Sequence, residues 1–220
     1  DCPRMKANFL VSAHPQARIP GARHLFVTDP YVTHVLEKSG ELGKFEEVVT
    51  ADPVRVTREA FVRDHEFVDR KYHQYIPILA RRLNELHGTN HDQRFWQKAL
   101  SLALLRHITF CFDLFQICEA NLRPEQHDCR ILSESGFFVP KDFNEHRRFF
   151  QHSDFGQEQL FSVYCRMFHP LRYEEWSGRH QWPNENQHSP IAASSLRSLG
   201  TRFNPRRLVR CLLRLRSPTV

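Results

Sequence analysis

The 220-residue chain is 40% hydrophobic and 12% aromatic, a composition that excludes a disordered protein and suits one sizeable core. Its formal net charge of +6 is uneven, because residues 196–220 hold seven arginines and no acidic residue, which leaves residues 1–195 at −1. The six cysteines include no CxxC pair, which favours a reduced, cytoplasmic protein. No run of about 18 apolar residues is present, so we expect no membrane-spanning helix.

The first 51 residues predict a small parallel sheet. Three short apolar runs are typical of buried strands: Asn8–Ala13, Arg23–Thr28 and Phe45–Ala51. A short helix begins at Asp29-Pro30 and ends at Gly40, between the second strand and the third. Strand, helix and strand within about 30 residues indicate a βαβ unit, whose strands run parallel.

Ligands of such sheets favour the loops that follow the strands. The expected ligand side therefore contains Ser12 and His14 at the C-terminal end of the first strand, and Thr28 and Asp29 at that of the second. Asp29 before a proline is also typical of a turn or helix cap, and this is the more frequent role. No GxGxxG or GxxxxGK[ST] motif follows a strand, so neither a dinucleotide site nor a P-loop is indicated.

The sequence after residue 56 predicts two long helices. The first covers Thr57–His87, with Gly88 as its end and Pro77 as a kink or a break between two helices near Tyr75. The second runs from about Asp92 to Ala120 and is apolar around most of its circumference, which is typical of a central helix. We therefore expect Leu104 and Ile108 to lie in the core.

The rest of the sequence predicts shorter helices and extended segments, followed by a polar linker and a basic tail. Residues 129–134 and 137–140 are extended, and residues 142–151 and 157–168 form amphipathic helices. The sequence thus indicates an α/β fold, with a small N-terminal Rossmann-like parallel sheet followed by a largely helical body. We divide it into a domain at residues 1–170, an irregular linker at 171–195 and a basic amphipathic tail at 196–220.

Informative polar residues gather where the two long helices meet. Asn84 and His87 share one face of the first helix, and Arg94 lies in the first turn of the second. Free N–H groups near Asp92, together with Arg94, would suit an anion such as a phosphate. The alternative is a structural cluster that locks the turn, with Asp92 as the cap and Arg94 paired to an acid such as Glu85.

The spacings of histidine and cysteine do not indicate a metal site or a nucleophilic thiol. The 14 histidines include no HExxH motif and no Cys/His pair at zinc spacing, so we predict no metal and no cofactor. Cys111 and Cys165 lie in apolar helical patterns, which protect a thiol rather than activate it.

The segment LNELHGTNHDQRFWQKAL resembles the signature of a transferase family from bacterial surface-carbohydrate gene clusters. Leu83, Asn84, His87, Arg94 and Trp96 match the family pattern, with Phe95 in place of a tyrosine. The Gly-Pro-Trp expected after this helix start is absent, and Ser-Leu-Ala is nearby instead. Members resemble two-domain nucleotide-sugar glycosyltransferases, so the resemblance implies an N-terminal, acceptor-side half that is catalytically incomplete alone.

The resemblance also implies roles and partners. His87 would be a general base or a hydrogen-bonding group for an acceptor hydroxyl, and Arg94 would bind phosphate or carboxylate. Asn84 and Trp96 would position the sugar or hold the junction. Apart from the resemblance, their place at the strand ends makes His14 and Asp29 candidate substrate-binding residues. The implied partners are a sugar-nucleotide donor and a glycan or lipid-linked acceptor, which places the protein in the cytoplasm.

The basic tail allows further hypotheses. Leucines alternate there with Arg206, Arg207, Arg210 and Arg214, a pattern typical of a helix that binds an anionic membrane, such as the inner membrane face. A nucleic-acid-binding module is the weaker alternative, because no aromatic residues interleave with these arginines. A non-catalytic scaffold or interaction domain is the third.

Overall fold

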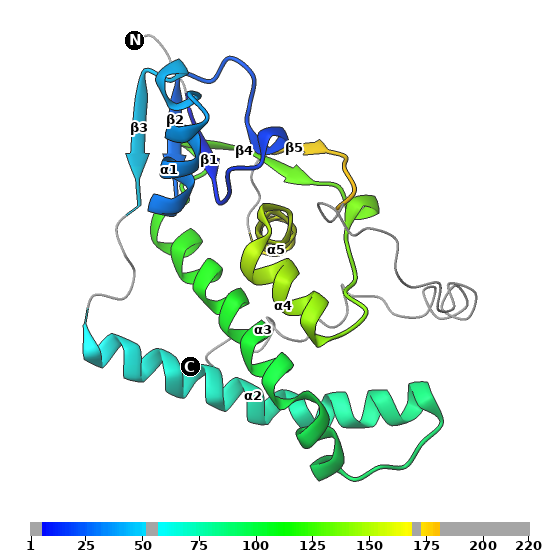
Figure 1. Cartoon of the computed structure of the whole chain (residues 1–220). Coiled ribbons are helices and arrows are strands. Elements are labelled where there is room, and N and C mark those ends of the chain that lie inside the picture. The colour runs from blue at the N-terminus through cyan, green and yellow to red at the C-terminus, as the bar shows by residue number, and fades with distance from the viewer. Residues whose placement is uncertain (1–5, 52–56, 169–172, 181–220) are drawn as a thin grey trace. The chain divides into compact units, whose positions relative to one another are not determined.

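The computed structural model describes residues 6–51, 57–168 and 173–180 (Figure 1). The chain divides into two units, Asp1–Arg179 and His180–Val220, and the described strands all belong to the first unit. These five strands are parallel, in the order β3-β2-β1-β4-β5. Their bounds are β1 Ala7–Leu10, β2 His24–Val27, β3 Glu47–Thr50, β4 His127–Leu132 and β5 Tyr173–Trp176.

The predicted βαβ unit is confirmed, and α1 (Pro30–Lys38) joins β2 to β3. Asp29 caps α1, since its carboxylate accepts a hydrogen bond of 2.7 Å from the backbone N–H of Tyr31. Beyond the helix Gly40 has φ 69°, a left-handed conformation that glycine adopts without steric cost. These local signals explain why the first strands and their helix were predictable from the sequence.

β5 corrects the expectation of an irregular linker from residue 171. Residues Tyr173–Trp176 pair in parallel with Cys129–Leu132 of β4 and extend the sheet. The sequence YEEW has two exposed glutamates between a partly buried tyrosine and the buried Trp176, as expected of an edge strand. Residues 181–195, and the predicted tail helix, lie outside the described residues.

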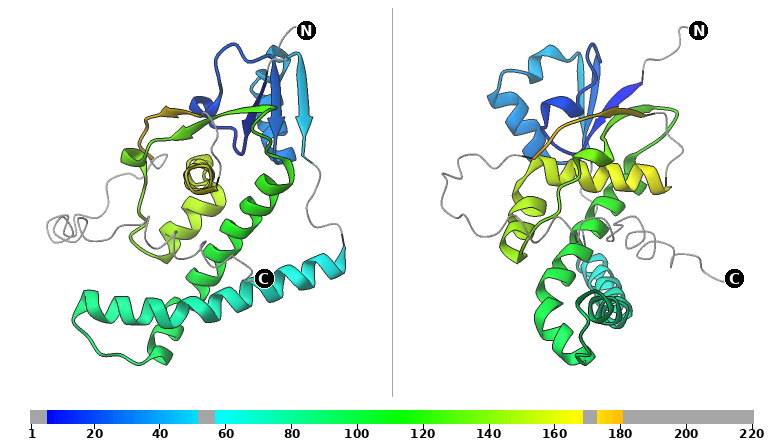
Figure 2. Two further views of the ribbon diagram at one scale, coloured as in Figure 1. Left: turned by 180° about the vertical axis from the view of Figure 1, so that it is seen from behind. Right: turned by 90° about the vertical axis from the view of Figure 1, so that its right-hand side faces the viewer.

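The two faces of the sheet are covered by different helices (Figures 1 and 2). α1 packs on β2 and, with residues of β1 and β2, encloses one apolar cluster that includes Leu10, Leu25 and Leu36. α5 (Asp154–Phe168) packs on β4 and contacts α4 (Phe143–His152), and Phe9 of β1 stacks on Phe161 of α5.

α2 (Arg58–His87) and α3 (Gln93–Asn121) form a helical hairpin, in which the two helices are joined by a short turn and cross each other at an angle (Figure 1). α2 is one continuous helix with Pro77 inside it, so the alternative of two helices meeting near Tyr75 is wrong. Pro77 is exposed while Tyr75 and Ile76 are buried, so packing of the opposite face offsets the missing hydrogen bond. Gly88 ends α2 in the left-handed conformation, as predicted.

α3 is less enclosed than its apolar sequence suggests. Ile108 is 7% exposed and belongs to the core, but Leu104 is only half-buried and Leu102 is 58% exposed, so the core prediction is wrong for Leu104. From about its middle onward α3 reaches α4 and α5, through residues such as His107 and Phe115, and its N-terminal part contacts α2. α3 is the one described helix long and apolar enough to span a membrane, by length and composition only, and 22% of its apolar window is buried.

Candidate functional site

The turn between α2 and α3 is built around the side chain of Asn84. Its carboxamide oxygen accepts hydrogen bonds from Thr89 Oγ1 (2.9 Å), His91 N (3.1 Å) and Trp96 Nε1 (2.9 Å). Its amide nitrogen donates to the carbonyl of His91 at 2.8 Å. An amide oxygen has two lone pairs, so three donors use its accepting capacity fully. Asn84 and Trp96 therefore hold the junction, which was one of the two roles expected of them.

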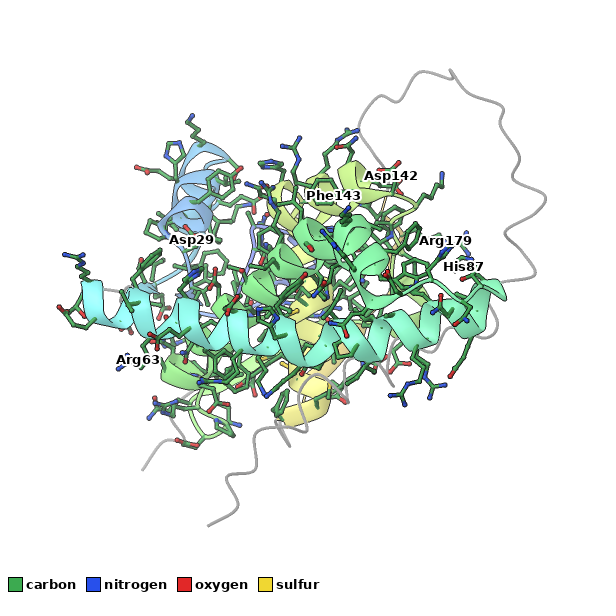
Figure 3. All side chains as sticks on the ribbon, turned by 90° about the horizontal axis from the view of Figure 1, so that it is seen from below. Asp29, Arg63, His87, Asp142, Phe143 and Arg179 are labelled. Carbon is green, nitrogen blue, oxygen red and sulfur yellow. The ribbon has the colours of Figure 1, made fainter. Side chains whose placement is uncertain are left out.

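His87 and Arg94 are exposed at this turn, and Figure 3 shows His87 at the C-terminal end of α2. The His87 ring lies over Trp96, with ring centres 6.1 Å apart and planes inclined by 23°. Asp92 caps α3 by accepting from Phe95 N at 2.7 Å, as predicted. Glu85 pairs with Arg82 at 2.7 Å, so the expected Arg94–Glu85 pair is replaced by a pair within α2.

A second group of polar side chains lies where the order of the strands reverses. β1 is followed outward by β2 and β3 on one side and by β4 and β5 on the other. β1 and β4 pair only through Ala7–Asn8 and His127–Asp128, so their carboxyl ends are not paired with each other. In open parallel sheets ligands bind outside the carboxyl ends of the strands at such a reversal, which is termed the switch point.

Ser12 and Glu158 form a buried pair at the switch point. Ser12, which follows β1, donates a hydrogen bond of 2.7 Å from Oγ to Oε1 of Glu158 on α5. Both residues are 1% exposed, and Glu158 Oε2 has no hydrogen-bond partner within the described part of the chain. Burial raises the pKa of Glu158 to about 8, against the lowering effect of the Ser12 hydroxyl, and nearby Asp154 raises it further. At neutral pH Glu158 is therefore mainly protonated.

His14 lies beside this pair in an aromatic setting. Its ring stacks on Trp176 with centres 4.7 Å apart, and it meets Phe155 edge-on at 5.7 Å. Burial lowers the pKa of His14, so the neutral imidazole is favoured. Nδ1 accepts a hydrogen bond of 3.3 Å from Gln16 N, which assigns the hydrogen of the neutral ring to Nε2. In this tautomer His14 is a hydrogen-bond donor rather than a base.

Two charged side chains act on His14, the carboxylate of Asp154 and the guanidinium of Arg18. Asp154 acts electrostatically on His14, Arg18 and Glu158, and it precedes Glu158 by one helical turn of α5. Arg18 forms an ion pair with Glu41 and donates to the carbonyl of Ala13 at 3.0 Å. Among the described residues, the polar atoms here without a hydrogen-bond partner thus include one carboxyl oxygen, Glu158 Oε2, and one guanidinium nitrogen, Arg18 Nε.

A third cluster, between α3 and α4, is structural. His146 Nε2 and His107 Nδ1 are 3.1 Å apart, and Cys111 Sγ lies 3.7 Å from His107 Nε2. Burial lowers the pKa of His107 to about 4 and raises that of Cys111 to about 12, so the imidazole is neutral and the thiol protonated. Both states are unreactive at neutral pH. Among the described residues no group of three His, Cys, Asp or Glu side chains could hold a metal ion.

The residues predicted from the sequence thus fall into separate regions. The hairpin turn holds Asn84, His87, Arg94 and Trp96, and Figures 1 and 2 show this turn well away from the strands. His14 lies at the switch point, while Asp29 caps α1 after β2 and is separate from His87 in Figure 3.

Sequence reasoning missed Glu158, although one signal was present. Glu158 belongs to a stripe spaced as one helical face, with Phe155, Ser162 and Cys165 as its other buried members. A lone acid inside such a stripe predicts a buried carboxyl group, and buried carboxyls have perturbed pKa values.

The chain is similar to known proteins at the level of a family. A family model described as LIC12162 family transferase matches residues 8–217, which is nearly the whole chain. No curated protein and no solved structure matches the chain.

Proposed function

Since the chain belongs to the LIC12162 family of transferases, we propose that it is the acceptor-side part of a glycosyltransferase-like enzyme with its reaction centre at the switch point. The enzyme would act in the synthesis of surface polysaccharide. One observation carries the location: the buried Ser12–Glu158 pair and the neutral His14 lie where the strand order of the parallel sheet reverses. Perturbed, partner-poor polar groups of this kind concentrate at functional sites.

His14 would act by donating a hydrogen bond. Its Nε2–H is the donor of the neutral tautomer and has no hydrogen-bond partner among the described residues, and the ring is only half-buried. A donor of this kind stabilises negative charge that develops on a substrate oxygen during transfer. Stacking on Trp176 fixes the orientation of the ring, which reduces the entropy lost when substrate binds.

The hairpin turn supports a second, separate role in acceptor binding. His87 and Arg94 are exposed on a turn whose backbone Asn84 holds, so an acceptor group would meet an imidazole and a guanidinium carried by a fixed backbone. Arg94 would bind a phosphate or carboxylate of a lipid-linked or acidic glycan. His87 would then be a hydrogen-bonding group or a base for that acceptor.

Two matched substitutions test the location. Because the acceptor-side part is expected to be catalytically incomplete alone, transfer is measured in the protein that includes a donor-binding part, as nucleotide released from a panel of sugar nucleotides with methyl glycosides as acceptors. We expect His14→Ala to lower kcat by about 100-fold, the usual effect of losing one such donor, and His87→Ala to raise KM with little change in kcat. Full activity of His14→Ala with loss of kcat in His87→Ala would move the reaction centre to the hairpin. The absence of transfer with every donor would favour a scaffold protein.

The proposed partners follow from the proposed reaction. A sugar nucleotide would be the donor and a glycan or lipid-linked sugar the acceptor, and the protein would work in the cytoplasm at the inner membrane face. The support for membrane association is the set of arginines Arg206, Arg207, Arg210 and Arg214. Co-sedimentation with anionic vesicles at low salt should fall when all four become glutamine, and equal recovery of both proteins would exclude this tether.

A further inference from the structure

We propose that the switch point holds the hydroxyl-bearing acceptor rather than the phosphate-bearing donor, and that Glu158 receives the proton of the reacting hydroxyl. This inference rests on the proposed function and names the substrate at the same site. It goes further by assigning a catalytic residue that lies in no sequence motif. The acceptor class is a sugar or another neutral polyol.

Only one of the two carboxyl oxygens of Glu158 is hydrogen-bonded within the described part of the chain. Ser12 Oγ holds Oε1 at 2.7 Å, while Oε2 is buried and has no partner among the described residues. A buried polar atom without a hydrogen bond is costly, so such an atom needs an explanation. A ligand hydroxyl would supply the missing partner, because it can donate to a carboxylate and accept from a carboxylic acid.

The orientation of the pair is fixed by its neighbours. The Ser12 hydroxyl also accepts a hydrogen bond of 3.1 Å from His14 N, which ties the loop after β1 to α5. Ser162, one turn beyond Glu158, accepts a hydrogen bond of 2.7 Å from Leu132 N at the end of β4. α5 is thereby joined to the carboxyl ends of both strands that flank the switch point.

Charge decides between acceptor and donor. A phosphate placed here would face the carboxylate of Asp154, and its charge would further disfavour the ionised form of Glu158, which the reaction needs as a base. The neighbouring cation, Arg18, is already paired with Glu41 and hydrogen-bonded to Ala13 O. A neutral hydroxyl avoids this repulsion and makes use of the carboxyl oxygen, so the site favours the acceptor.

The proton transfer balances without any further reagent. A lone pair of the acceptor oxygen forms the bond to the transferred sugar carbon, and the bond from that carbon to the phosphate oxygen of the sugar nucleotide breaks with its electron pair. The hydroxyl proton passes to Oε2 of ionised Glu158, which later releases it to solvent. A carboxyl with a raised pKa is a stronger base than an ordinary glutamate, although a smaller fraction is ionised at neutral pH.

Two neighbours should shift the titration of Glu158 in opposite directions. Ser12 favours the ionised form by donating to it, so Ser12→Ala should raise the pKa of Glu158. Asp154 disfavours the ionised form, so Asp154→Asn should lower that pKa. Cys165 is the other titratable group that Glu158 affects, and burial raises its own pKa well above the ordinary value, so it stays a thiol throughout this range.

The first experiment tests the substrate class by direct binding. Full-length protein labelled with carboxyl-¹³C glutamate is titrated with methyl glucoside, galactoside and mannoside, and separately with UDP and inorganic phosphate. The Glu158 resonance is assigned by its loss in Glu158→Gln. We expect at least one glycoside to shift this resonance saturably in the absence of UDP, and inorganic phosphate to leave it unmoved. UDP would bind next to the reacting carbon and serves as the comparison: a larger saturable shift with UDP than with any glycoside, a shift with phosphate, or no shift with any glycoside would overturn the proposal.

The second experiment tests the proton-accepting role. We expect Glu158→Gln to lower kcat by about 10²- to 10⁴-fold, the usual value of general-base catalysis, with a smaller change in KM. In the wild type the rate should increase with pH through an apparent pKa near 8. This limb should move up in Ser12→Ala and down in Asp154→Asn, which a merely structural role would not produce. Glu37→Gln, at an exposed position on α1, is the control.

The outcomes separate this inference from the proposed function. Transfer that depends on His14 but proceeds equally in Glu158→Gln would overturn the inference and leave the proposed function intact. A glycoside-induced shift of Glu158 in a protein that transfers no sugar would reject the proposed function and Glu158's catalytic role, leaving only a polyol site. Because glutamine has the same shape and is neutral, like the protonated acid, Glu158→Gln should fold, and its melting curve verifies this.

Discussion

Replacing Glu158 by glutamine should change how the stability of the protein depends on pH. In the folded protein burial raises the pKa of Glu158 to about 8, from an ordinary value of 4.5 that applies when the chain is unfolded. Between these two values the unfolded chain releases the proton while the folded protein retains it. The free energy of unfolding therefore decreases as pH rises from 4.5 to 8 and is level beyond both limits. Glutamine does not titrate, so the variant lacks this decrease.

The size of the effect follows from the separation of the two pKa values. Each unit of difference is worth about 1.4 kcal/mol, so the stability of Glu158→Gln relative to the wild type should rise by about 5 kcal/mol between pH 4.5 and pH 8. Other titrating groups, such as His107, are common to both proteins and cancel in this difference. A change of this size is a large fraction of the total stability of an ordinary domain.

Urea unfolding followed by tryptophan fluorescence, at half-unit steps from pH 4.5 to pH 9, measures the difference directly. Glu37→Gln removes a carboxylate from an exposed position and should follow the wild type at every pH. A constant difference between Glu158→Gln and the wild type would mean that Glu158 titrates normally in the folded protein. That result would remove the electrostatic basis for its proposed role.

Four further predictions concern the hairpin and the core. Ile108→Ala should cost about 3 kcal/mol of unfolding free energy and Leu104→Ala about half as much, because only Ile108 is fully buried; equal losses in urea titrations would contradict this. Asn84→Ala should lower the free energy of unfolding by about 2 kcal/mol, because the donors of the turn lose their acceptor. Arg94→Lys should leave the melting temperature unchanged. A lower melting temperature would assign Arg94 a structural role. Burial lowers the pKa of His107 to about 4, so the wild type should lose about 3 kcal/mol as pH falls from 6.5 to 4, and His107→Gln should lack that loss.

The fold was predictable where local signals and burial agree. The capping residues Asp29, Thr57 and Asp92 and the terminating glycines Gly40 and Gly88 mark helix ends that the structure confirms. These residues act within three or four positions of themselves, through side-chain acceptors or a left-handed backbone, so a single sequence contains all the information needed.

The prediction failed where tertiary contacts decide the outcome. Residues 173–176 are polar enough to resemble a linker, and only pairing with β4 makes them a strand. Leu104 has the same apolar character as Ile108, but burial depends on which turns of α3 reach α4 and α5. Pro77 normally interrupts a helix, yet the buried face around Tyr75 and Ile76 keeps α2 continuous.

The candidate site shows why a prominent sequence pattern and a reactive site need not coincide. The pattern at the hairpin is distinctive because one turn needs a side chain that both donates and accepts at Asn84, an indole donor at Trp96 and a left-handed glycine at Gly88. Each of these requirements is geometric. The residue types are therefore explained by the fold of the turn before any chemistry is assigned to it.

At the switch point, in contrast to the hairpin, no local sequence pattern marks the residues that meet. Ser12 and Glu158 are 146 positions apart, so no spacing rule links them, and each is ordinary in its own segment. Their significance arises only when the parallel sheet brings the end of β1 against α5. A buried carboxyl that holds its proton near neutrality destabilises the folded protein as pH rises, because the folded state resists ionisation that the unfolded chain undergoes. The bond to Ser12 explains one oxygen of this carboxyl, because it ties the loop after β1 to α5. The second oxygen has no hydrogen-bond partner among the described residues, and this argues for a chemical role at this position.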